Sequence, residues 1–519
     1  MATPASSSQP PFKKLLIANR GEIAVRVIRG ARDIGIATVA VHSDVDANLP
    51  HVRLADEAYC IGPAPSAKSY LNTERILEVA KETGVDAIHP GYGFLSENAA
   101  FVDACEAAGI TFVGPSGDAM RQMGDKIESR RTMKAAGVPI VPGTIDPVAD
   151  PEEAIKIANG IGYPVAIKAS AGGGGRGIRI VESEGEMARA MANAQDEARA
   201  SFGDDAVFIE KYISPARHIE IQLIADKHGN VVTLGERECS IQRRRQKLIE
   251  EAPSTAVSPQ LRAQMEEAAA NVARAVNYYS AGTVEFLVYG EDEFAFLEMN
   301  TRLQVEHPVT EMTRGVDLVG DQLRIAAGEP LTYTADDRPL HGWSMECRII
   351  AEDPFNGYLP STGKIPYYRE PAGPGVRVES MLHAGMEVSI HYDSLLAKLV
   401  TWGEDREQCR QRMKRALSEF QILGVSTSIP FHLAMLDDAN FIAGDITTDY
   451  VESSFQIGDD RPDTSTHAAL AAAAFLTKDG ESAPAEPRLN GDGSRSRAWG
   501  MYARGKRTPL EIGWRRSYL

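Results

Sequence analysis

Residues 298–307, EMNTRLQVEH, carry a chemically versatile side chain at every second position. These even positions hold Glu298, Asn300, Arg302, Gln304 and Glu306. In an extended chain alternate side chains point to the same face, so this segment sets a row of carboxylates, amides and a guanidinium opposite a mostly apolar row. The pattern predicts a strand that is buried on one face and serves a polar site on the other.

The segment just before this row predicts a hairpin over residues 282–300, with its turn near residues 290–292. A turn centred between residues 291 and 292 places Glu285 directly opposite Glu298. The core face would then carry Val284, Phe286, Leu297 and Met299. Because two facing carboxylates repel, this arrangement favours a divalent cation over a solvent-exposed acidic edge. Their hard oxygen ligands predict magnesium bound to the phosphates of a nucleotide, with Asn300 extending the ligand set.

Residues 171–177, AGGGGRG, predict a phosphate-binding loop. Consecutive glycines let backbone N–H groups turn toward an anion, and Lys168 on the preceding strand adds positive charge. The segment is not a P-loop, since that motif places Lys-Ser or Lys-Thr after the glycines and before a helix. Four consecutive glycines exceed what a hairpin turn needs, so we expect a lid that folds over a bound nucleotide.

The basic segment SIQRRRQK, residues 240–247, supplies Gln242 and four cationic side chains. If it is extended, alternation puts Arg243, Arg245 and Lys247 on one face. The segment lacks an aromatic platform, so RNA contact is the weaker interpretation, and a small anion beside the nucleotide is the stronger one. The single histidines His218 and His307 are each more often structural than catalytic.

The composition is that of a globular protein with about two to four domains in its 519 residues. The net charge of −17 argues against a general nucleic-acid binder, because phosphate neutralisation requires an excess of Lys and Arg. There is no basic leader followed by an apolar run, and no apolar stretch long enough for a membrane span. The five cysteines occur singly, which predicts reduced, buried thiols and a cytoplasmic location.

Strands alternate with helices to about residue 120, which predicts an α/β fold that begins with a doubly wound parallel sheet. Its first turn, ANRGE, has a single glycine and therefore lacks a dinucleotide-binding fingerprint. Residues 163–213 predict strand pairs around one long helix, and residues 218–236 predict a hairpin. A mixed α+β segment follows from about residue 335, and a Pro/Gly/Ser-rich linker follows residue 450.

In residues 12–450 the sequence closely resembles the biotin carboxylases, which have the ATP-grasp fold. The matching motifs, in chain order, are ANRGEIAVRVIRG, HPGYGFLSEN, MGDK, YPVAIKASAGGGGRG, FIEKYI, RHIEIQ, SIQRRRQK, EEAPS, EMNTRLQVEHPVTEM and ECRIIAEDP. The resemblance implies an N-terminal doubly wound domain (12–121), an ATP-grasp domain (122–334, lid about 140–212) and a mixed α+β C-terminal domain (335–452). Residues 453–519 would be a linker and a tail that docks a partner.

In this family ATP phosphorylates bicarbonate to carboxyphosphate, whose breakdown carboxylates N1 of biotin. The resemblance implies ATP contacts at Lys126, Lys168, Gly174, Gly175 and His218, and adenine contacts at Glu210, Lys211 and Ile213. Gln242 joins this cofactor-binding set. Magnesium, or alternatively manganese, would be bound by Glu285, Glu298 and Asn300. Bicarbonate would contact Lys247, Arg302, Gln304 and the backbone of Val305, with Glu306 as the general base. Biotin would meet Arg302, Arg348 and Tyr92.

One position departs from the family pattern, because Arg245 stands where relatives often carry a histidine. The chain also has no Met-Lys-Met tip of a biotin carrier, and RMKRA (412–416) lies in a helical, charged pattern. We therefore expect biotin on a separate biotin carboxyl carrier protein, the alternative being a native chain that continues into a carrier domain. A carboxyltransferase subunit and a homo-oligomer are also expected. Trp499 and Trp514 would belong to a docking tail. Neither a nucleic acid nor a membrane is expected as a partner.

The complete enzyme would be an acyl-CoA carboxylase of the acetyl-CoA or propionyl-CoA type, or alternatively a pyruvate carboxylase. A carboxylate–amine ligase of the ATP-grasp fold would share the lid and the metal carboxylates but would not need the anion- and biotin-binding set. That set comprises Lys247, Arg302, Gln304, Glu306 and Arg348. A noncatalytic, nucleotide-sensing subunit would lack a metal carboxylate or the base, and neither is missing.

Overall fold

The computed structural model describes residues 10–148, 150–169, 178–202 and 205–458, apart from the side chains of residues 126, 201 and 202. The chain divides into two units, Met1–His467 and Ala468–Leu519. Gly174 and Gly175 of the predicted phosphate-binding loop lie outside the described residues, as do Trp499 and Trp514 of the predicted docking tail. Among the helices of the described residues, none has the length and apolar character that a membrane span requires.

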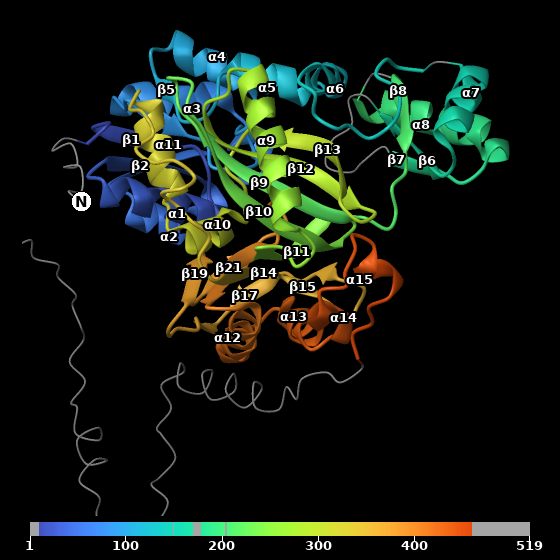
Figure 1. The fold of residues 1–519 in the computed structure, drawn as a ribbon. Coiled ribbons are helices and arrows are strands. Elements are labelled where there is room, and N and C mark those ends of the chain that lie inside the picture. The colour runs from blue at the N-terminus through green and yellow to red at the C-terminus, as the bar shows by residue number, and fades with distance from the viewer. Residues whose placement is uncertain (1–9, 149, 170–177, 203–204, 459–519) are drawn as a thin grey trace, which may run out of the picture. The chain divides into compact units, whose positions relative to one another are not determined.

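A five-stranded parallel sheet opens the fold, in the order β3-β2-β1-β4-β5 (Figure 1). Its strands are β1 (Lys14–Ile17), β2 (Ala37–Ser43), β3 (Glu57–Gly62), β4 (Ala87–His89) and β5 (Thr111–Phe112). The accompanying helices are α1 (Gly21–Asp33), α2 (Pro50–Leu54), α3 (Thr73–Thr83), α4 (Ala99–Ala107), α5 (Gly117–Gly124) and α6 (Lys126–Ala135). The sheet confirms the doubly wound arrangement predicted from alternating strands and helices.

The edge strand β3 was not predicted, and it also corrects the expectation that every cysteine is buried. Along β3 exposed and more covered positions alternate, because only one face of this edge strand packs on the core. Cys60 lies on its exposed face, whereas Cys105, Cys239, Cys347 and Cys409 are buried. All five are free thiols, as their single occurrence predicted.

A separate three-stranded sheet, in the order β7-β6-β8, follows the parallel sheet. Its strands are β6 (Val165–Ala169), β7 (Ile178–Val181) and β8 (Val207–Lys211), and its helices are α7 (Pro151–Ile161) and α8 (Glu184–Phe202). Both helices pack their apolar side chains on this sheet around Val165, Ile167 and Ile209. This sheet therefore has its own small core.

An antiparallel sheet of eight strands, in the order β13-β12-β9-β10-β11-β14-β21-β19, carries most of the candidate site residues. Its strands are β9 (Arg217–Ala225), β10 (Val231–Arg243), β11 (Gln246–Ala252), β12 (Ser280–Tyr289), β13 (Glu293–Asn300), β14 (Trp343–Ile350), β19 (Val376–Ser380) and β21 (Leu395–Gly403). In Figure 1 the colour passes from green to orange where β11 pairs with β14. One sheet thus crosses the domain boundary expected at residue 335.

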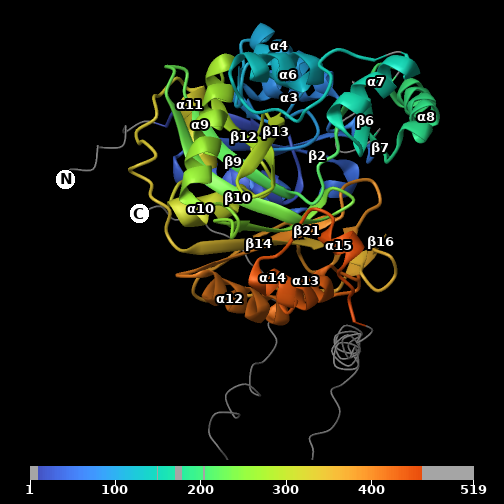
Figure 2. The ribbon, with the colours of Figure 1, turned by 45° about the vertical axis from the view of Figure 1, so that its right-hand side comes forward.

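The helices of this part pack on both faces of the long sheet. They are α9 (Pro259–Ala275), α10 (His307–Arg314), α11 (Leu318–Ala326), α12 (Arg406–Glu419), α13 (Ile429–Leu436), α14 (Ala439–Ala443) and α15 (Tyr450–Ser453). In Figure 2, α12 and α13 lie beneath β14 and β21, on the side away from α10. Residues 412–416 fall inside α12, as the charged helical pattern predicted. Three two-stranded sheets complete this part: β15 (Glu352–Asp353) with β16 (Leu359–Pro360), β17 (Gly363–Ile365) with β20 (Met386–Val388), and β18 (Tyr367–Arg369) with β22 (Gln421–Leu423).

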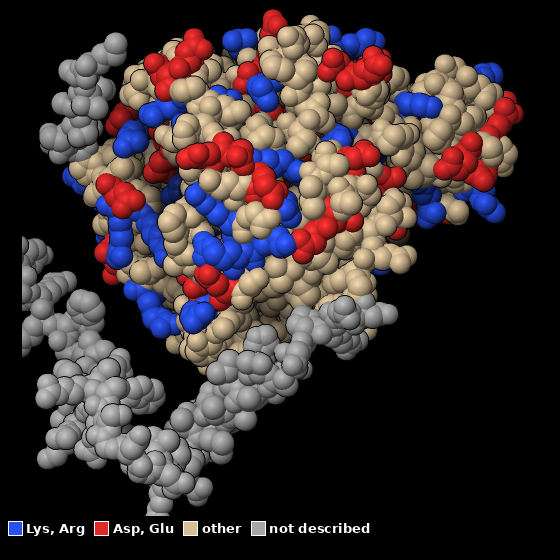
Figure 3. Space-filling model, turned by 60° about the horizontal axis from the view of Figure 1, so that its bottom comes forward, with Lys and Arg blue, Asp and Glu red and all other residues tan. Residues whose placement is uncertain are grey.

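The two faces of β14 and β21 differ in chemistry. Cys347, Ile349 and Leu399 belong to the apolar core on the α12 side. Alternation turns Arg348 and Lys398, which are direct cross-strand neighbours, to the opposite face toward α10. The sheet therefore presents buried charges to the segment that precedes α10. On the outer face displayed in Figure 3, Lys and Arg side chains are interspersed with Asp and Glu side chains.

Candidate active site

The hairpin of β12 and β13 has the register predicted from the sequence, with Glu285 directly opposite Glu298. Its turn spans residues 290–292, also as predicted. The register shifts after Glu285, so that Phe286 pairs with Phe296. As a result Phe296, rather than Leu297, joins Val284, Phe286 and Met299 in the core beneath the hairpin, and the expectation for Leu297 was wrong. The bulge leaves the two carboxylates opposite each other and changes which side chains face the core in the part of the hairpin nearer the turn.

The expectation that residues 298–307 form one extended strand was wrong. β13 ends at Asn300, residues 301–306 form an irregular loop, and α10 begins at His307. The polar side chains still converge, because the loop folds back over Glu285. Asn300 Nδ2 and Gln304 Nε2 both donate to Glu285 Oε1, at 2.9 Å each. Hydrogen bonds to Glu285 therefore bring together polar side chains that a continuous strand would have placed on one face.

Lys247 joins three carboxylates from three different segments. Its ammonium group donates to Glu220 Oε2 at 2.6 Å, to Glu285 Oε1 at 2.9 Å and to Glu306 Oε1 at 2.6 Å. An opposite charge at this distance favours the charged forms of Glu285 and Glu306. Lys247 therefore lies at the centre of the candidate site.

The basic segment does not present Arg243, Arg245 and Lys247 on one face, because it is not extended. Arg244 and Arg245 form the two-residue turn between β10 and β11, with φ of 49° and 65°. Both angles lie in the left-handed region that such tight turns require. Lys247 instead pairs with Gln242, which is buried on β10, and points to the carboxylate cluster. Arg245 lies at the tip of the turn.

Glu306 is a buried carboxylate between two cations. Besides Lys247 it accepts a hydrogen bond from Arg348 Nη2 at 2.9 Å, and Arg348 also donates to Glu250 at 2.6 Å. Burial by itself would raise the pKa of Glu306, but Lys247 and Arg348 outweigh it, with help from Arg237, and lower that pKa well below its usual value. Glu306 is therefore ionised, as a proton acceptor must be.

Arg302 is held at the surface of the site by Glu97, a residue that sequence reasoning did not single out. Arg302 Nε donates to Glu97 Oε2 at 2.9 Å, and Arg302 Nη2 donates to Asn300 Oδ1, also at 2.9 Å. Glu97 accepts from Thr301 N at 3.0 Å as well. Glu97 lies in the HPGYGFLSEN motif, which is one of the motifs that match the family. The motif did not reveal that Glu97 contacts Arg302.

Arg237 and Glu220 form a second buried layer that the sequence did not reveal. Arg237 is fully buried and donates to Glu220 Oε1 at 2.6 Å and to Gln304 Oε1 at 3.3 Å. Its other hydrogen bonds reach Gln222, Thr283 and Thr310. This guanidinium ties β9, β12 and the loop 301–306 together beneath Lys247.

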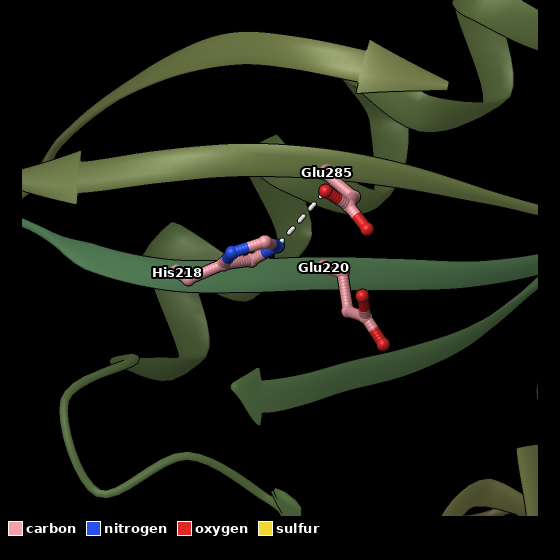
Figure 4. A group of neighbouring side chains, drawn as sticks. All are labelled: His218, Glu220 and Glu285. Carbon is pink, nitrogen blue, oxygen red and sulfur yellow. Dashed lines mark ion pairs between the residues drawn. The ribbon is translucent and has the colours of Figure 1, made fainter. Parts of the chain in front are cut away.

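Figure 4 shows a group that is able to hold a metal ion, with His218 and Glu220 on β9 and Glu285 on β12. His218 Nε2 lies 3.0 Å from Glu285 Oε2. Burial alone would raise the pKa of Glu285, but Lys247 and His218 hold it well below its usual value, so that this ligand is charged. The ligands predicted from the hairpin, Glu285, Glu298 and Asn300, offer oxygen donors only, which fits magnesium better than a site with imidazole.

Glu220, Cys239 and Glu306 form a second group of metal-binding residue types. Burial, followed by the charge of Glu220, raises the pKa of the Cys239 thiol well above its usual value. The thiol is therefore protonated and a poor metal ligand. Glu306 is already shared between Lys247 and Arg348. This group is better explained as part of the polar interior.

The predicted nucleotide contacts cluster around β6 and β8. Lys168 forms an ion pair with Glu210, whose other oxygen accepts from Arg130 Nη1 at 3.2 Å. Lys211 donates to the carbonyl oxygens of Gly162 and Tyr163 at 3.0 and 3.1 Å. Ile213 is half-buried just after β8, and Lys126 is the first residue of α6. His218, on β9, contacts Glu285 instead.

Tyr92 and Val305 meet through a residue that had not been assigned, Lys398. The ammonium group of Lys398 lies 5.7 Å from the centre of the Tyr92 ring. It donates to the carbonyl oxygen of Val305 at 2.8 Å. The structure thus brings the predicted biotin-flanking ring and the predicted anion-binding backbone to the same buried cation.

Together these groups could align a metal-bound phosphoryl donor, a small anion and a proton acceptor. The hairpin carboxylates lie at one end, Lys247 and Arg302 beside them, and Glu306 beyond. Preorganised cations near developing negative charge stabilise a transition state without reorganisation. The arrangement suits phosphoryl transfer to a small oxyanion.

Three family models match the chain. They are described as "Biotin carboxylase, N-terminal domain" over residues 11–120, "Carbamoyl-phosphate synthase L chain, ATP binding domain" over residues 125–334, and "Biotin carboxylase C-terminal domain" over residues 346–453.

Several curated proteins resemble the chain over most of its length. Biotin carboxylase 1 of Bacillus subtilis is 54% identical over 443 residues, which are 85% of this chain and 98% of the relative. A pyruvate carboxylase subunit of Methanothermobacter thermautotrophicus is 54% identical over 442 residues, 85% of this chain and 90% of the relative. The mitochondrial propionyl-CoA carboxylase alpha chain of Caenorhabditis elegans is 52% identical over 453 residues, 87% of this chain and 63% of the relative.

A solved structure with a similar fold is the biotin carboxylase domain dimer of the 2-oxoglutarate carboxylase of Hydrogenobacter thermophilus. It was determined in complex with MgADP, ADP and bicarbonate. The TM-score is 0.82 at 51% sequence identity, over 85% of this chain and 97% of that one.

Proposed function

The chain belongs to the biotin carboxylase family, and from this premise we propose that it carboxylates carrier-bound biotin as one component of an acyl-CoA carboxylase. Its ATP-grasp fold and its ATP-dependent ligase activity are those of the family. In the proposed reaction, ATP transfers its terminal phosphoryl group to bicarbonate and leaves ADP. Carboxyphosphate would then break down to carbon dioxide and phosphate. The released phosphate would take the N1 proton of biotin, and N1 would attack the carbon dioxide.

The observation that carries this proposal is the position of Lys247 between Glu285 and Glu306. One ammonium group lies 2.9 Å from a proposed metal ligand and 2.6 Å from the proposed base. An anion bound by Lys247 would therefore be next to both the phosphoryl donor and the proton acceptor. A short separation of reacting groups lowers the entropic part of the barrier.

The chain's residues fit magnesium in this role. Glu285 and Glu298 face each other across the hairpin, and Asn300 adds an amide oxygen. The ion would neutralise the charge that develops on the transferred phosphoryl group. Lys168 and the glycine run would hold the remaining phosphate oxygens, with Lys126, Gly174 and Gly175 in the same set. Glu210, Lys211, Ile213, His218 and Gln242 would line the rest of the nucleotide site.

Glu306 is proposed as the base that takes the bicarbonate proton. With Lys247 and Arg348 both bonded to it, its pKa lies well below the usual value, and its proton affinity is correspondingly small. Bicarbonate bound to Lys247, Arg302, Gln304 and the backbone of Val305 would draw Lys247 away from Glu306. The loss of a neighbouring cation raises a carboxylate pKa, so binding of the anion would itself strengthen the base.

Arg302, Arg348 and Tyr92 are proposed to receive biotin. Arg348, on β14, donates to Glu306, and Arg302, in the loop 301–306, donates to Asn300 and Glu97. The two guanidinium groups would stabilise the enolate-like oxygen of the ureido ring as its N1 becomes nucleophilic. Tyr92 would pack beside that ring.

The partners and the final acceptor are also proposals. Biotin would arrive on a separate carrier protein, a carboxyltransferase subunit would use the product, and the chain would form a homo-oligomer like the dimer named for the Hydrogenobacter domain. The proposed acceptor is an acyl-CoA of the acetyl-CoA or propionyl-CoA type, with pyruvate as the alternative. Similar proteins are named for propionyl-CoA, pyruvate and 2-oxoglutarate carboxylases.

The test is ATP hydrolysis by the purified chain with and without bicarbonate and free biotin. A biotin carboxylase needs bicarbonate for turnover and is stimulated by free biotin. A carboxylate–amine ligase would respond to neither, and a nucleotide-sensing subunit would hydrolyse no ATP under any of the conditions. Either of these results would overturn the proposal.

A further inference from the structure

Two successive peptide groups around Val305 are each held at the carbonyl oxygen by a buried side chain. The carbonyl oxygen of Gln304 accepts a hydrogen bond from His307 Nδ1 at 2.7 Å. The carbonyl oxygen of Val305 accepts one from Lys398 Nζ at 2.8 Å. Both His307 and Lys398 are 0% exposed. Neither side chain has a role in the proposed chemistry.

A held carbonyl oxygen also fixes the N–H group on the other side of the same peptide plane. In a trans peptide the C=O and N–H bonds point in opposite directions. His307 therefore sets the direction of the Val305 N–H, and Lys398 sets the peptide that leads into Glu306. Within the described residues, the Val305 N–H donates to no protein acceptor. It is the group through which an anion would contact this backbone.

Lys398 is itself fixed by three separate parts of the fold. On β21 it stands opposite Arg348 of β14 and opposite Glu379 of β19. Its ammonium group lies 3.3 Å from Glu22 Oε2 on α1. The Tyr92 ring lies over the same ammonium group. Because these neighbours hold the Lys398 ammonium group in place, its hydrogen bond to Val305 restrains the loop 301–306 relative to the sheet.

His307 is suited to donate a single hydrogen bond. It is the first residue of α10, where Pro308 follows it. Burial, assisted by Lys398, Arg26 and Arg377, lowers its pKa well below the usual value, so the ring is neutral. Because its partner is a carbonyl oxygen, the proton is on Nδ1.

We propose that His307 and Lys398 are positioning residues, which aim the Val305 N–H and the Glu306 carboxylate at bicarbonate. The inference rests on the proposed function, because it assigns these two residues to the same anion site. His307 acts on bicarbonate binding through the N–H of Val305. Lys398 acts on proton transfer through the backbone of Glu306.

The roles proposed for His307 and Lys398 predict different changes in the steady-state kinetic constants. In His307→Leu the carbonyl oxygen of Gln304 loses the side-chain donor and keeps only the longer hydrogen bond from the backbone N–H of residue 307, at 3.4 Å. We expect the KM for bicarbonate to rise about tenfold while the KM for ATP is unchanged. His307→Asn places an amide N–H near the position of Nδ1 and should restore most of the wild-type KM. In Lys398→Met we expect kcat to fall about tenfold, with a smaller change in the KM for bicarbonate.

Matched controls come from the turn between β9 and β10. Lys227 donates to the carbonyl oxygen of Ala326 at 2.9 Å, and His228 contacts that of Gly328 at 2.9 Å, both away from the site. Lys227→Met and His228→Leu remove the same kinds of bond and should leave both kinetic constants unchanged. If Lys398→Met fails to fold, the double variant Lys398→Met/Glu22→Gln balances the charge and should show the same kcat effect.

The outcomes distinguish this inference from the function on which it rests. If the wild-type chain shows no bicarbonate-dependent ATP hydrolysis, the proposed function is wrong. If the wild type is active but folded His307→Leu keeps its KM for bicarbonate, or raises the KM for ATP in parallel, the positioning role of His307 is wrong. An unchanged kcat in the folded Lys398 variants would overturn the role of Lys398.

Discussion

Glu285 and Glu298 stand directly opposite one another on β12 and β13, yet only Glu285 is buried. Glu285 is surrounded by donors from Lys247, Asn300 and Gln304, whereas Glu298 lies on the exposed side of the edge strand. The pair therefore consists of a fixed carboxylate and an accessible one. In the proposed magnesium site, Glu285 would be the buried ligand and Glu298 the solvent-exposed one.

Glu298→Gln should severely weaken metal-dependent ATP hydrolysis, because the variant loses one of two proposed anionic ligands. We expect a cost of several kcal/mol in kcat/KM for the magnesium–nucleotide complex. The measurement is ATP turnover as a function of magnesium concentration. Glu291→Gln, in the exposed turn of the same hairpin, is the control and should behave like the wild type. Normal ATP turnover by Glu298→Gln at saturating magnesium would contradict the assignment of Glu298 as a metal ligand.

Glu306→Gln should retain nucleotide binding and lose biotin carboxylation. A positioned base typically contributes ~10² to 10⁴ in rate, and the amide cannot accept the bicarbonate proton. Titration calorimetry with the nucleotide and a carboxylation assay with free biotin measure the two properties separately. If nucleotide affinity fell together with activity, Glu306 would be a structural partner of Lys247 and Arg348 rather than the base.

The double variant Gly174→Ala/Gly175→Ala should raise the KM for ATP or slow closure of the proposed lid. These glycines lie outside the described residues, so the expectation comes from the sequence, in which a Cβ would obstruct phosphate approach or a positive φ. Thermal unfolding of the ligand-free variant should be nearly unchanged. Kinetics identical to the wild type would mean that the glycine run is only a linker.

His432 should make the protein less stable as the pH falls. Burial lowers its pKa to about 4, despite the hydrogen bond between Nε2 and the carbonyl oxygen of Arg348 at 2.7 Å. The unfolded chain takes up a proton near pH 6.5, so the folded state loses stability between that pH and about 4. Relative to His432→Gln, the wild type should lose about 1.4 kcal/mol between pH 7.5 and 5.5. Urea unfolding at the two pH values measures this difference, and a constant difference would contradict the pKa.

Coexpression with a biotin ligase should leave this chain unmodified, because it presents no Met-Lys-Met tip. Residues 412–416, which contain the nearest match, lie in α12. Intact mass measurement tests the expectation, and a mass increase of one biotin would refute it.

Deletion of residues 453–519 should preserve carboxylation of free biotin and abolish assembly with the carboxyltransferase. Unchanged assembly would leave the tail without a docking role.

The sequence was most informative where local rules decide the structure. Alternation and the turn near Gly290 were sufficient for the register that pairs Glu285 with Glu298. They were insufficient for Leu297, because a bulge adds one residue without any mark such as glycine or proline. The turn at Arg244 and Arg245 was missed for a related reason, since two arginines with positive φ carry none of the usual turn residues.

The remaining errors concern contacts between distant segments. Alternation continues in the sequence beyond Asn300, but the strand stops there, and Glu97 instead accepts a hydrogen bond from Thr301 N. Arg237, Glu97 and Lys398 each serve the loop 301–306 from segments that are far away in the chain. The pattern of residues within a short segment cannot predict contacts with distant segments. These three residues were therefore identified only from the structure.

The pairing of β11 with β14 has a consequence for how the chain can be divided. A cut at residue 334 would remove β14, β19 and β21 and leave β11 as a new edge, with the backbone N–H and C=O groups that face β14 unpaired. Exposed edges of this kind recruit strands from other molecules. The residues before the cut would therefore carry an aggregation-prone edge, and we expect the segments on either side of the cut to depend on each other for folding.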